Sequence, residues 1–452
     1  MKERLASVFR LNAVSSLQLF QLIRYGSFLL VGVLFAKLQL PQTSISQFEW
    51  IIMMAGFLSF FWVSGVINSM LSLYPRRNEQ ERGVLLFNTF LLLTAFSAVV
   101  AVGVLLAYEL HLLAFRDILV LVAFYNIVNA PAFLTEYVLF LHKQNKALLA
   151  YGFITGLLTL VGLGICALQA TGVVNIVPIA GQYFELAALL LLGVVALVKW
   201  LVLLSLLGKH GTFKVDFNLL KTHLLLALPI MLTLLVSGSA EYIDGLIVNA
   251  RFHGSFFAVY RYGAKELPIL LIIANTFSTA MIPSIAADLQ QGLDELKVKS
   301  TRLMHLFFPI TIVLLVVSPL LYYYVFSENF VYSAVIFNIY LLLAIPRVLF
   351  PQTIIMGLQH SRYQLVSAVL EITLNVSLSL WLSYKIGLPG IALGTFIAYC
   401  FDKAFLIAIN KWKYGISPSK YINLPVFIGY TLTTLAAFAL GFRLFQSGFW
   451  GF

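Results

Sequence analysis

Residues 83–108 have the sequence GVLLFNTFLLLTAFSAVVAVGVLLAY, 26 residues without a single charged side chain. A helix needs about 20 mostly apolar residues to cross a bilayer, so this stretch predicts a transmembrane helix. Twelve further runs have the same character: 15–37, 48–74, 117–141, 147–169, 176–204, 222–249, 255–285, 303–326, 331–357, 364–386, 389–410 and 422–445. The runs are continuous rather than alternating and exceed the roughly 9–11 residues of a membrane β-strand. The sequence therefore predicts an all-α polytopic membrane protein with 12–14 transmembrane helices.

The composition supports the same class. Of 452 residues, 61% are hydrophobic and 10% are charged, against about 25% charged residues in soluble domains. The mean hydropathy is +0.95. The two cysteines, Cys166 and Cys400, both lie in apolar runs, which excludes a disulfide scaffold.

The basic residues predict the orientation of the chain. If Met1 is cytoplasmic, the connections on its side carry nineteen Lys and Arg, Lys199 included, and the opposite connections carry five. Cytoplasmic loops of membrane proteins show this bias. The net charge of +11 is thus explained mostly by topology, and nucleic acid is not expected as a partner. We expect a multi-pass protein of the bacterial inner membrane with a cytoplasmic N-terminus.

The chain also contains a candidate internal repeat at an offset of 218 residues. The offset aligns LHKQNKALLAYGFIT, from Leu141, with QHSRYQLVSAVLEIT, from Gln359, so that His142 matches His360. Two copies of six helices share one orientation and are related by an axis along the membrane normal. The predicted division is an N-lobe at 1–210, a C-lobe at 211–411, and a basic connection with one additional helix at 412–452. Such lobes favour a transporter with a central cavity and alternating access.

Ionisable residues inside the predicted spans are the candidate site residues, because charge at bilayer depth is costly and faces a cavity or a partner. Five cations are candidates for binding an anionic substrate: Arg24, Arg261, Lys265, Arg347 and Lys403. Five carboxylates are candidates for ion coupling or for charge pairing: Glu136, Glu241, Asp244, Glu371 and Asp402.

Arg347 is the most informative cation, because Pro346 and Pro351 flank it and predict a bent helix. A guanidinium at mid-depth suits a phosphate, although it could instead be tied to a carboxylate or a carbonyl. Arg24 could line a cavity or extend toward the headgroups, and the same alternative applies to Lys403. Because Asp402 and Lys403 are adjacent, we expect their side chains to project about 100° apart and not to face each other.

The hairpin of the seventh and eighth helices places charges at matching depth on its two arms. Asp244 lies level with Arg261, and Glu241 with Lys265. These residues could form neutralising ion pairs, or a substrate anion or a proton could compete for them.

Several kinds of chemistry have no motif in the chain. There is no GxxxxGK[ST] loop for ATP, no HExxH, no cysteine and histidine spacing for zinc, and no GxSxG. We therefore expect no cofactor and no metal site, and an energy source in the membrane potential or a coupling ion, proton or sodium. The predicted outer loops are short, which disfavours a membrane-embedded glycan polymerase or ligase.

Two segments carry a resemblance to a known family. They are LPIMLTLLVSGSAEYID, residues 228–244, and AVYRYGAK, residues 258–265. With RYGSFLLVGVLFAKL near the N-terminus, the chain resembles, over residues 15–410, the polysaccharide flippases of the multidrug/oligosaccharidyl-lipid/polysaccharide exporter superfamily. These serve O-antigen and capsule synthesis.

The resemblance implies two six-helix lobes around a cationic cavity. It also implies export of an undecaprenyl-pyrophosphate-linked oligosaccharide to the outer leaflet, beside other polysaccharide-assembly membrane proteins. The related peptidoglycan-precursor flippases have fourteen helices, whereas this chain has one predicted helix after twelve, and Tyr25 follows Arg24 where an acidic residue is expected. A drug or cation antiporter of the same superfamily is the alternative, and it would need an acidic cavity with few cations.

Overall fold

The computed structural model describes residues 13–110, 116–174, 183–252, 254–265, 268–360 and 362–447, and these ranges contain helices and no strand. Eleven described helices are long and apolar enough to cross a membrane. Two further pairs of shorter helices pass the same test together, each bent at a break, and counting each pair as one span gives thirteen. The predicted all-α polytopic membrane protein is confirmed.

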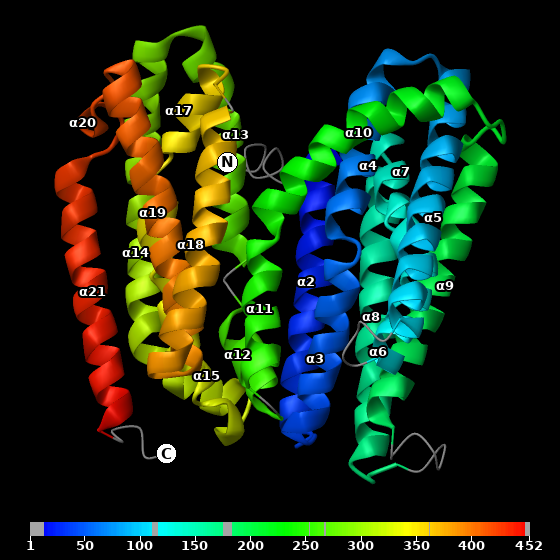
Figure 1. The fold of residues 1–452 in the computed structure, drawn as a ribbon, viewed down its shortest axis with the longest axis horizontal. Coiled ribbons are helices and arrows are strands. Elements are labelled where there is room, and N and C mark those ends of the chain that lie inside the picture. The colour runs from blue at the N-terminus through cyan, green and yellow to red at the C-terminus, as the bar shows by residue number, and fades with distance from the viewer. Residues whose placement is uncertain are drawn as a thin grey trace, which may run out of the picture. The chain divides into compact units, whose positions relative to one another are not determined.

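The chain divides into two compact units, Met1–Gly238 and Ser239–Phe452. The helices of the first unit run in chain order (Figure 1): α2 (Ala13–Lys37), α3 (Gln42–Phe57), α4 (Phe60–Leu73), η1 (Tyr74–Arg76), α5 (Glu79–Glu109), α6 (Arg116–Ala132), α7 (Leu134–Leu141), α8 (Asn145–Ala170), α9 (Phe184–His210) and α10 (Phe217–Gly238). Within the unit, α2 packs along α8, α5 along α6, and α9 against both α6 and α8.

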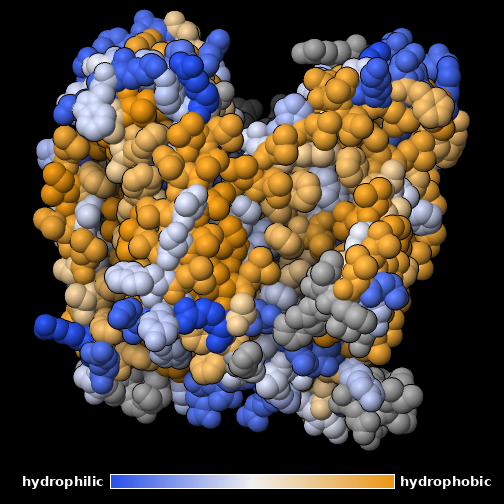
Figure 2. Space-filling view, in the orientation of Figure 1, coloured by the Kyte–Doolittle hydropathy of each residue, from blue (hydrophilic) through white to orange (hydrophobic). Residues whose placement is uncertain are grey.

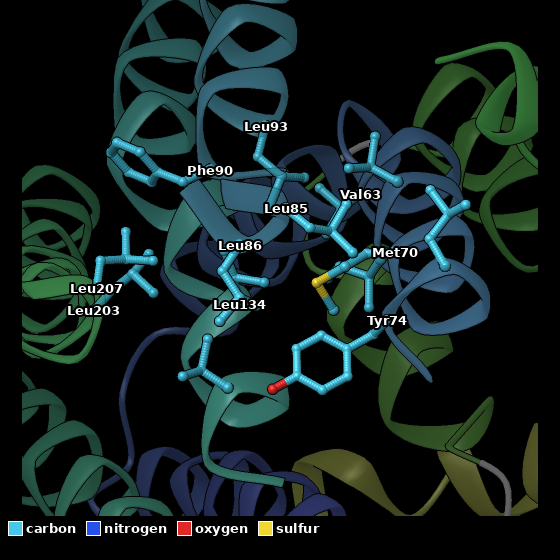
Figure 3. Packing of buried hydrophobic residues seen from close by; sticks show 14 of the residues in the cluster. Val63, Met70, Tyr74, Leu85, Leu86, Phe90, Leu93, Leu134, Leu203 and Leu207 are labelled. Atoms are coloured by element: carbon cyan, nitrogen blue, oxygen red, sulfur yellow. The ribbon is translucent and has the colours of Figure 1, made fainter. Parts of the chain in front are cut away.

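The core of the first unit is a cluster of buried aliphatic and aromatic side chains. Figure 3 shows Met70 and Tyr74 beside Leu85, with Leu203 and Leu207 of α9 at the far side of the cluster. These residues come from four different helices, so burial of their side chains away from lipid and water holds the helices in one arrangement.

The long helix α5 begins at a capping box. The Glu81 N–H donates to Asn78 Oδ1 at 2.9 Å, and the Asn78 N–H donates to Glu81 Oε2 at 3.3 Å. Because the first N–H groups of a helix have no partner within it, this reciprocal pair fixes where α5 starts.

The helix α10 packs along α4 and so belongs to the first unit, although the sequence division at residue 210 assigns this segment to the second lobe. Gly65 of α4 leaves room for Met231 of α10. The ring of His223 is buried and its Nε2 lies 3.0 Å from the Val66 carbonyl oxygen, which adds a polar contact to an otherwise apolar interface.

The second unit contains α11 (Ala240–Arg251), α12 (Phe256–Gly263), α13 (Pro268–Ala287), α14 (Leu289–Val325), η2 (Glu328–Phe330), α15 (Ser333–Leu341), α16 (Ala344–Arg347), α17 (Pro351–Gly357), α18 (Arg362–Ile386), α19 (Leu388–Tyr414), α20 (Pro418–Tyr421) and α21 (Leu424–Gln446). α18 packs along α19, and the thirteenth span, α21, packs along α14 (Figure 1). Gly441 lies against the Leu315 carbonyl and allows this close approach.

Some local features of the first unit recur in the second. The fourth span of the first unit is interrupted where α6 ends at Ala132, directly after Pro131, and α7 begins at Leu134. In the second unit, the α15–α16 segment is bent by 44° against α17, whose first residue is Pro351. Each broken span leads into a turn with a histidine, and that histidine lies against a ring at the end of the sixth span. The ring centroids of His142 and His210 are 3.8 Å apart, and those of His360 and Tyr414 are 5.3 Å apart.

The surface matches a membrane protein. Figure 2 shows hydrophobic side chains along the helices of each unit and hydrophilic side chains toward the helix ends. The exposed side chains of α8 include Phe153, Ile154 and Val161, and each is more than half exposed. Such surface is compatible with acyl chains and not with water.

Candidate functional site

The first polar cluster lies within the first unit and begins with an ion pair. Arg24 of α2 donates from Nη1 to both oxygens of Glu136 of α7, at 3.1 and 3.3 Å. The Arg24 side chain is 38% exposed and that of Glu136 is 5% exposed. The guanidinium carbon also lies 5.6 and 5.3 Å from the ring centroids of Phe20 and Phe133. Arg24 is therefore held inside the unit rather than extended toward headgroups.

This ion pair faces a cavity that is open to the surface. The walls come from five helices of the unit, and the cavity-facing side chains include three charged groups: Arg24, Glu136 and Lys199. Neutral hydrogen-bonding groups complete the lining, namely Ser27, Asn129, Tyr151, Thr155 and Thr159. Two cations against one carboxylate leave the cavity with a net positive charge.

Lys199 is a site residue that the sequence interpretation missed. The topology prediction counts it among the basic residues of a cytoplasmic connection, but α9 continues for eleven residues beyond it to His210. At 1.5 Å per residue, Lys199 lies about 16 Å from that end of the helix. Its position within the predicted run 176–204 was the available signal, because a lysine inside an apolar run is a candidate in its own right.

A second polar cluster lies within the second unit, around Asp244 of α11. The Asp244 side chain is buried, and its Oδ2 accepts hydrogen bonds from three hydroxyl groups. These are Tyr340 at 2.8 Å, Tyr260 at 3.3 Å and Thr395 at 2.5 Å. Asn375 of α18 extends the cluster by donating to Thr395 Oγ1 at 3.0 Å. Five helices therefore converge on one carboxylate.

Two oxygens of this cluster lack a hydrogen-bond partner within the described part of the chain. They are Asp244 Oδ1 and Asn375 Oδ1, and both are buried. A buried oxygen without a partner is costly and requires an explanation, such as an ion that the site accommodates. A carboxylate surrounded by neutral oxygen atoms is a donor set that suits a small hard cation.

The predicted charge pairs of the hairpin are not what holds Asp244. Its described partners are hydroxyl groups, and Arg261 is not among them. Arg261 lies half-buried on α12, whereas Lys265 follows that helix with its Nζ 4.4 Å from the Tyr262 ring centroid. The side chain of Glu241 lies outside the described residues.

Arg347 lies at the predicted bend, as the last residue of α16 before the break. It lines an open cavity within the second unit, together with Thr311 and Tyr340. Its guanidinium carbon is 5.8 Å from the Tyr399 ring centroid, and the same ring lies 4.6 Å from Lys403 Nζ.

Asp402 and Lys403 correct a prediction. Expected to point apart, they form an ion pair of 2.9 Å, because the long lysine stem folds back along α19. Both residues are 6% exposed, so Lys403 does not extend to the surface. Ser367 donates to Asp402 Oδ1 at 2.5 Å, and Glu371 of α18 is close enough to interact electrostatically with the pair.

Comparison with solved structures identifies the fold. The chain aligns with the lipid II flippase MurJ in an inward closed conformation with a TM-score of 0.68 and 16% identity, over 95% of this chain and 92% of that one. An outward-facing multidrug resistance MATE family transporter of the MOP superfamily gives a TM-score of 0.57 and 12% identity, over 95% and 97%. A MOP superfamily transporter from Pyrococcus furiosus gives 0.52 and 13%, over 97% of both chains.

The protein is thus a multi-pass membrane protein with the fold that MATE transporters and the MurJ flippase share. No protein-family model matches the sequence, and no curated protein is close enough to it to count as a relative. Among these three structures the flippase gives the highest TM-score, and the predicted branch of O-antigen and capsule flippases is not distinguished by the fold.

Proposed function

We propose that the protein is a flippase, not an enzyme, that moves a lipid-linked oligosaccharide from the inner to the outer leaflet by alternating access. The observation that carries the proposal is the open cavity of the first unit, where Arg24 and Lys199 outnumber Glu136. A net positive, hydrogen-bonding cavity among transmembrane helices suits an anionic headgroup with a polar glycan.

The chemistry of undecaprenyl pyrophosphate fits this cavity. Its diphosphate carries about two negative charges, which cannot cross hydrocarbon without compensating groups. Arg24 bonds Glu136 through Nη1, so its other N–H groups can bind phosphate oxygens, and Lys199 adds a second positive charge. The hydroxyl and amide groups of Thr155, Thr159 and Asn129 supply hydrogen bonds for sugar. The isoprenoid tail can stay in lipid.

Arg347 is proposed as a second anion-binding residue, since it lines its own cavity at a bend of the helix. Arg261 and Lys265 stay predictions for the same role. Lys403 is better explained as a structural partner of Asp402, because that ion pair is buried.

The Asp244 cluster is proposed as the site of the coupling ion, proton or sodium. Two buried oxygens without described partners support a cation there, and a proton on Asp244 Oδ1 would turn that oxygen into a hydrogen-bond donor. One charge that moves through 100 mV provides about 2.3 kcal/mol, which can drive the transport cycle. The remaining carboxylates Glu136, Glu371 and Asp402 are each close to a cation and are proposed as charge partners.

The proposed location is the bacterial inner membrane, with the N-terminus in the cytoplasm, because a lipid-linked glycan is made at the cytoplasmic face before export. Other membrane proteins of polysaccharide assembly would be its partners there. A multidrug or cation antiporter is the second candidate, and the buried carboxylate Asp244 is the feature that favours it.

The test measures access of lipid-linked glycan to the outer leaflet of proteoliposomes that contain the protein. We expect Arg24→Ala and Arg347→Ala to reduce translocation at least about tenfold, since each lost charge-assisted contact is worth about 1.5–3 kcal/mol. Lysine at either position should restore part of the rate. Arg443→Ala, on the exposed face of α21, is the matched control and should leave it unchanged. Normal translocation by both alanine variants would contradict the proposal.

A further inference from the structure

We propose that Tyr340 couples the cation site at Asp244 to the anion-binding cavity of Arg347. This inference rests on the proposed function, because it assumes that the two sites bind a cation and a phosphate group. It assigns to Tyr340 a positioning role, in which the residue transmits occupancy of one site to the shape of the other.

The position of Tyr340 between the two sites supports this role. Its hydroxyl donates to Asp244 Oδ2 at 2.8 Å and lies 2.8 Å from the hydroxyl of Tyr260. The same residue lines the cavity that contains Arg347. Tyr340 therefore belongs to both the carboxylate cluster and the wall of the cavity, and Arg347 follows it by seven residues along the same broken span.

The chain of cause and effect runs through the hydrogen bond to the carboxylate. An ionised Asp244 is a strong acceptor that holds the Tyr340 hydroxyl in place. A cation or proton on Asp244 neutralises this acceptor and weakens the hydrogen bond. The Tyr340 side chain then loses its strongest hydrogen bond and can shift, and because it forms part of the cavity wall, the space available beside Arg347 changes. A packed helix break responds to such a change by moving between discrete arrangements.

Tyr260 provides a matched comparison within the same cluster. It also donates to Asp244 Oδ2, at 3.3 Å, and is fully buried, but it does not line the Arg347 cavity. Loss of the Tyr260 hydroxyl should therefore weaken cation binding at Asp244, while a bound cation should still change binding in the Arg347 cavity. The other described groups that contact the cluster, Thr395 and Asn375, are likewise neutral and belong to α19 and α18.

The experiment measures binding of farnesyl pyrophosphate to the full-length protein in nanodiscs. Binding is compared with and without sodium at constant ionic strength, and at two pH values in sodium-free buffer. For the wild type we expect the cation to tighten binding by about 5-fold or more, the lower end of typical coupling between sites. Arg347→Ala should weaken the cation-sensitive part of probe binding and abolish the cation effect, which assigns the effect to this cavity rather than to the cavity of Arg24.

The decisive comparison is between the two phenylalanine variants. We expect Tyr340→Phe to bind the probe with the same affinity with and without the cation. We expect Tyr260→Phe to show the same ratio of probe affinities with and without the cation as the wild type, but to need a higher cation concentration to reach it. Thermal unfolding of both variants checks that they fold. If the cation tightened probe binding by Tyr340→Phe as much as it does for the wild type, the inference would be overturned and the proposed function would stay intact. A wild type with no cation effect would overturn both this inference and the coupling role of Asp244.

Discussion

At the scale of single residues, the ion pair of Arg24 and Glu136 orients a guanidinium toward a cavity. Glu136 is 5% exposed and cannot lose its partner without leaving a buried charge, whereas Arg24 is 38% exposed and keeps donors for another ligand. The carboxylate of Glu136 therefore fixes the position of the Arg24 guanidinium and leaves some of its N–H groups able to bind a ligand. This explains how a paired arginine can still serve as a binding residue.

The ion pair leads to a prediction that separates stability from transport. Arg24→Ala should lower the stability of the protein by about 1–3 kcal/mol, because it leaves Glu136 unsatisfied, and should abolish most translocation. The double variant Arg24→Ala with Glu136→Gln should regain thermal stability while translocation stays low. Thermal unfolding in detergent and the leaflet assay measure the two effects. Recovery of transport in the double variant would show that Arg24 serves only to neutralise Glu136.

Lys199 gives a second prediction with a control on the same helix. Lys199→Gln should weaken binding of a diphosphate lipid about 10-fold or more, because it removes one charge-assisted contact inside the cavity. Lys209→Gln lies near the end of α9 on an exposed side chain and should change the affinity less than about twofold. Titration of both variants with farnesyl pyrophosphate makes the comparison. Equal effects of the two substitutions on probe affinity would show that Lys199 acts only through the overall positive charge of the protein and not through a contact in the cavity.

At the scale of helices, small residues shape the cavity of the first unit. Gly152 and Gly156 of α8 line the cavity, and a side chain at either position would run into Phe20 or Ser27 of α2. The close packing of α2 on α8 thus depends on glycine, and so does the space beside Arg24.

This packing predicts opposite outcomes for two glycines. Gly156→Val should lower the thermal stability and reduce binding of the diphosphate probe, because the new side chain separates α2 from α8 and enters the cavity. Gly193→Ala, on α9, meets no atom within 4 Å and should be neutral or slightly stabilising. Thermal unfolding and probe titration report both effects, and unchanged binding by Gly156→Val would contradict the proposed position of the headgroup.

Much of the helix order could be predicted from the sequence, because membrane spans leave a strong apolar signal and prolines mark the breaks. The bend beside Arg347 is one example. Side-chain partners could not be predicted in this way. The Asp402–Lys403 pair depends on how a flexible lysine stem folds back, and the hydroxyl groups around Asp244 come from segments up to 151 residues away. The position of Lys199 within α9 depends on where that helix ends, and hydropathy places helix ends poorly.

At the scale of the whole molecule, the two units differ in their polar clusters. The cluster of the first unit has a net positive charge, with Arg24 and Lys199 around Glu136. The cluster of the second unit is a single carboxylate among neutral oxygen atoms. This difference in charge is what the proposed function requires, with an anionic substrate bound in one half and a coupling cation in the other.

The orientation in the membrane is a prediction for the molecule as a whole. In a background without Cys166 and Cys400, a single cysteine at Val173 should react with a membrane-impermeant maleimide added to intact cells. A cysteine at Lys214 should react only after the membrane is permeabilised. Both positions are exposed in the structure, so lack of reaction reports location rather than burial. The reverse pattern would invert the predicted topology.

The most direct test of the central claim compares substrates of opposite charge in one set of proteoliposomes. The wild-type protein should move a diphosphate-linked glycolipid between leaflets and should not move the same glycan on a neutral lipid. It should also fail to accumulate the organic cation ethidium under an ion gradient. Transport of ethidium without translocation of the diphosphate lipid would contradict the account and establish a cation antiporter.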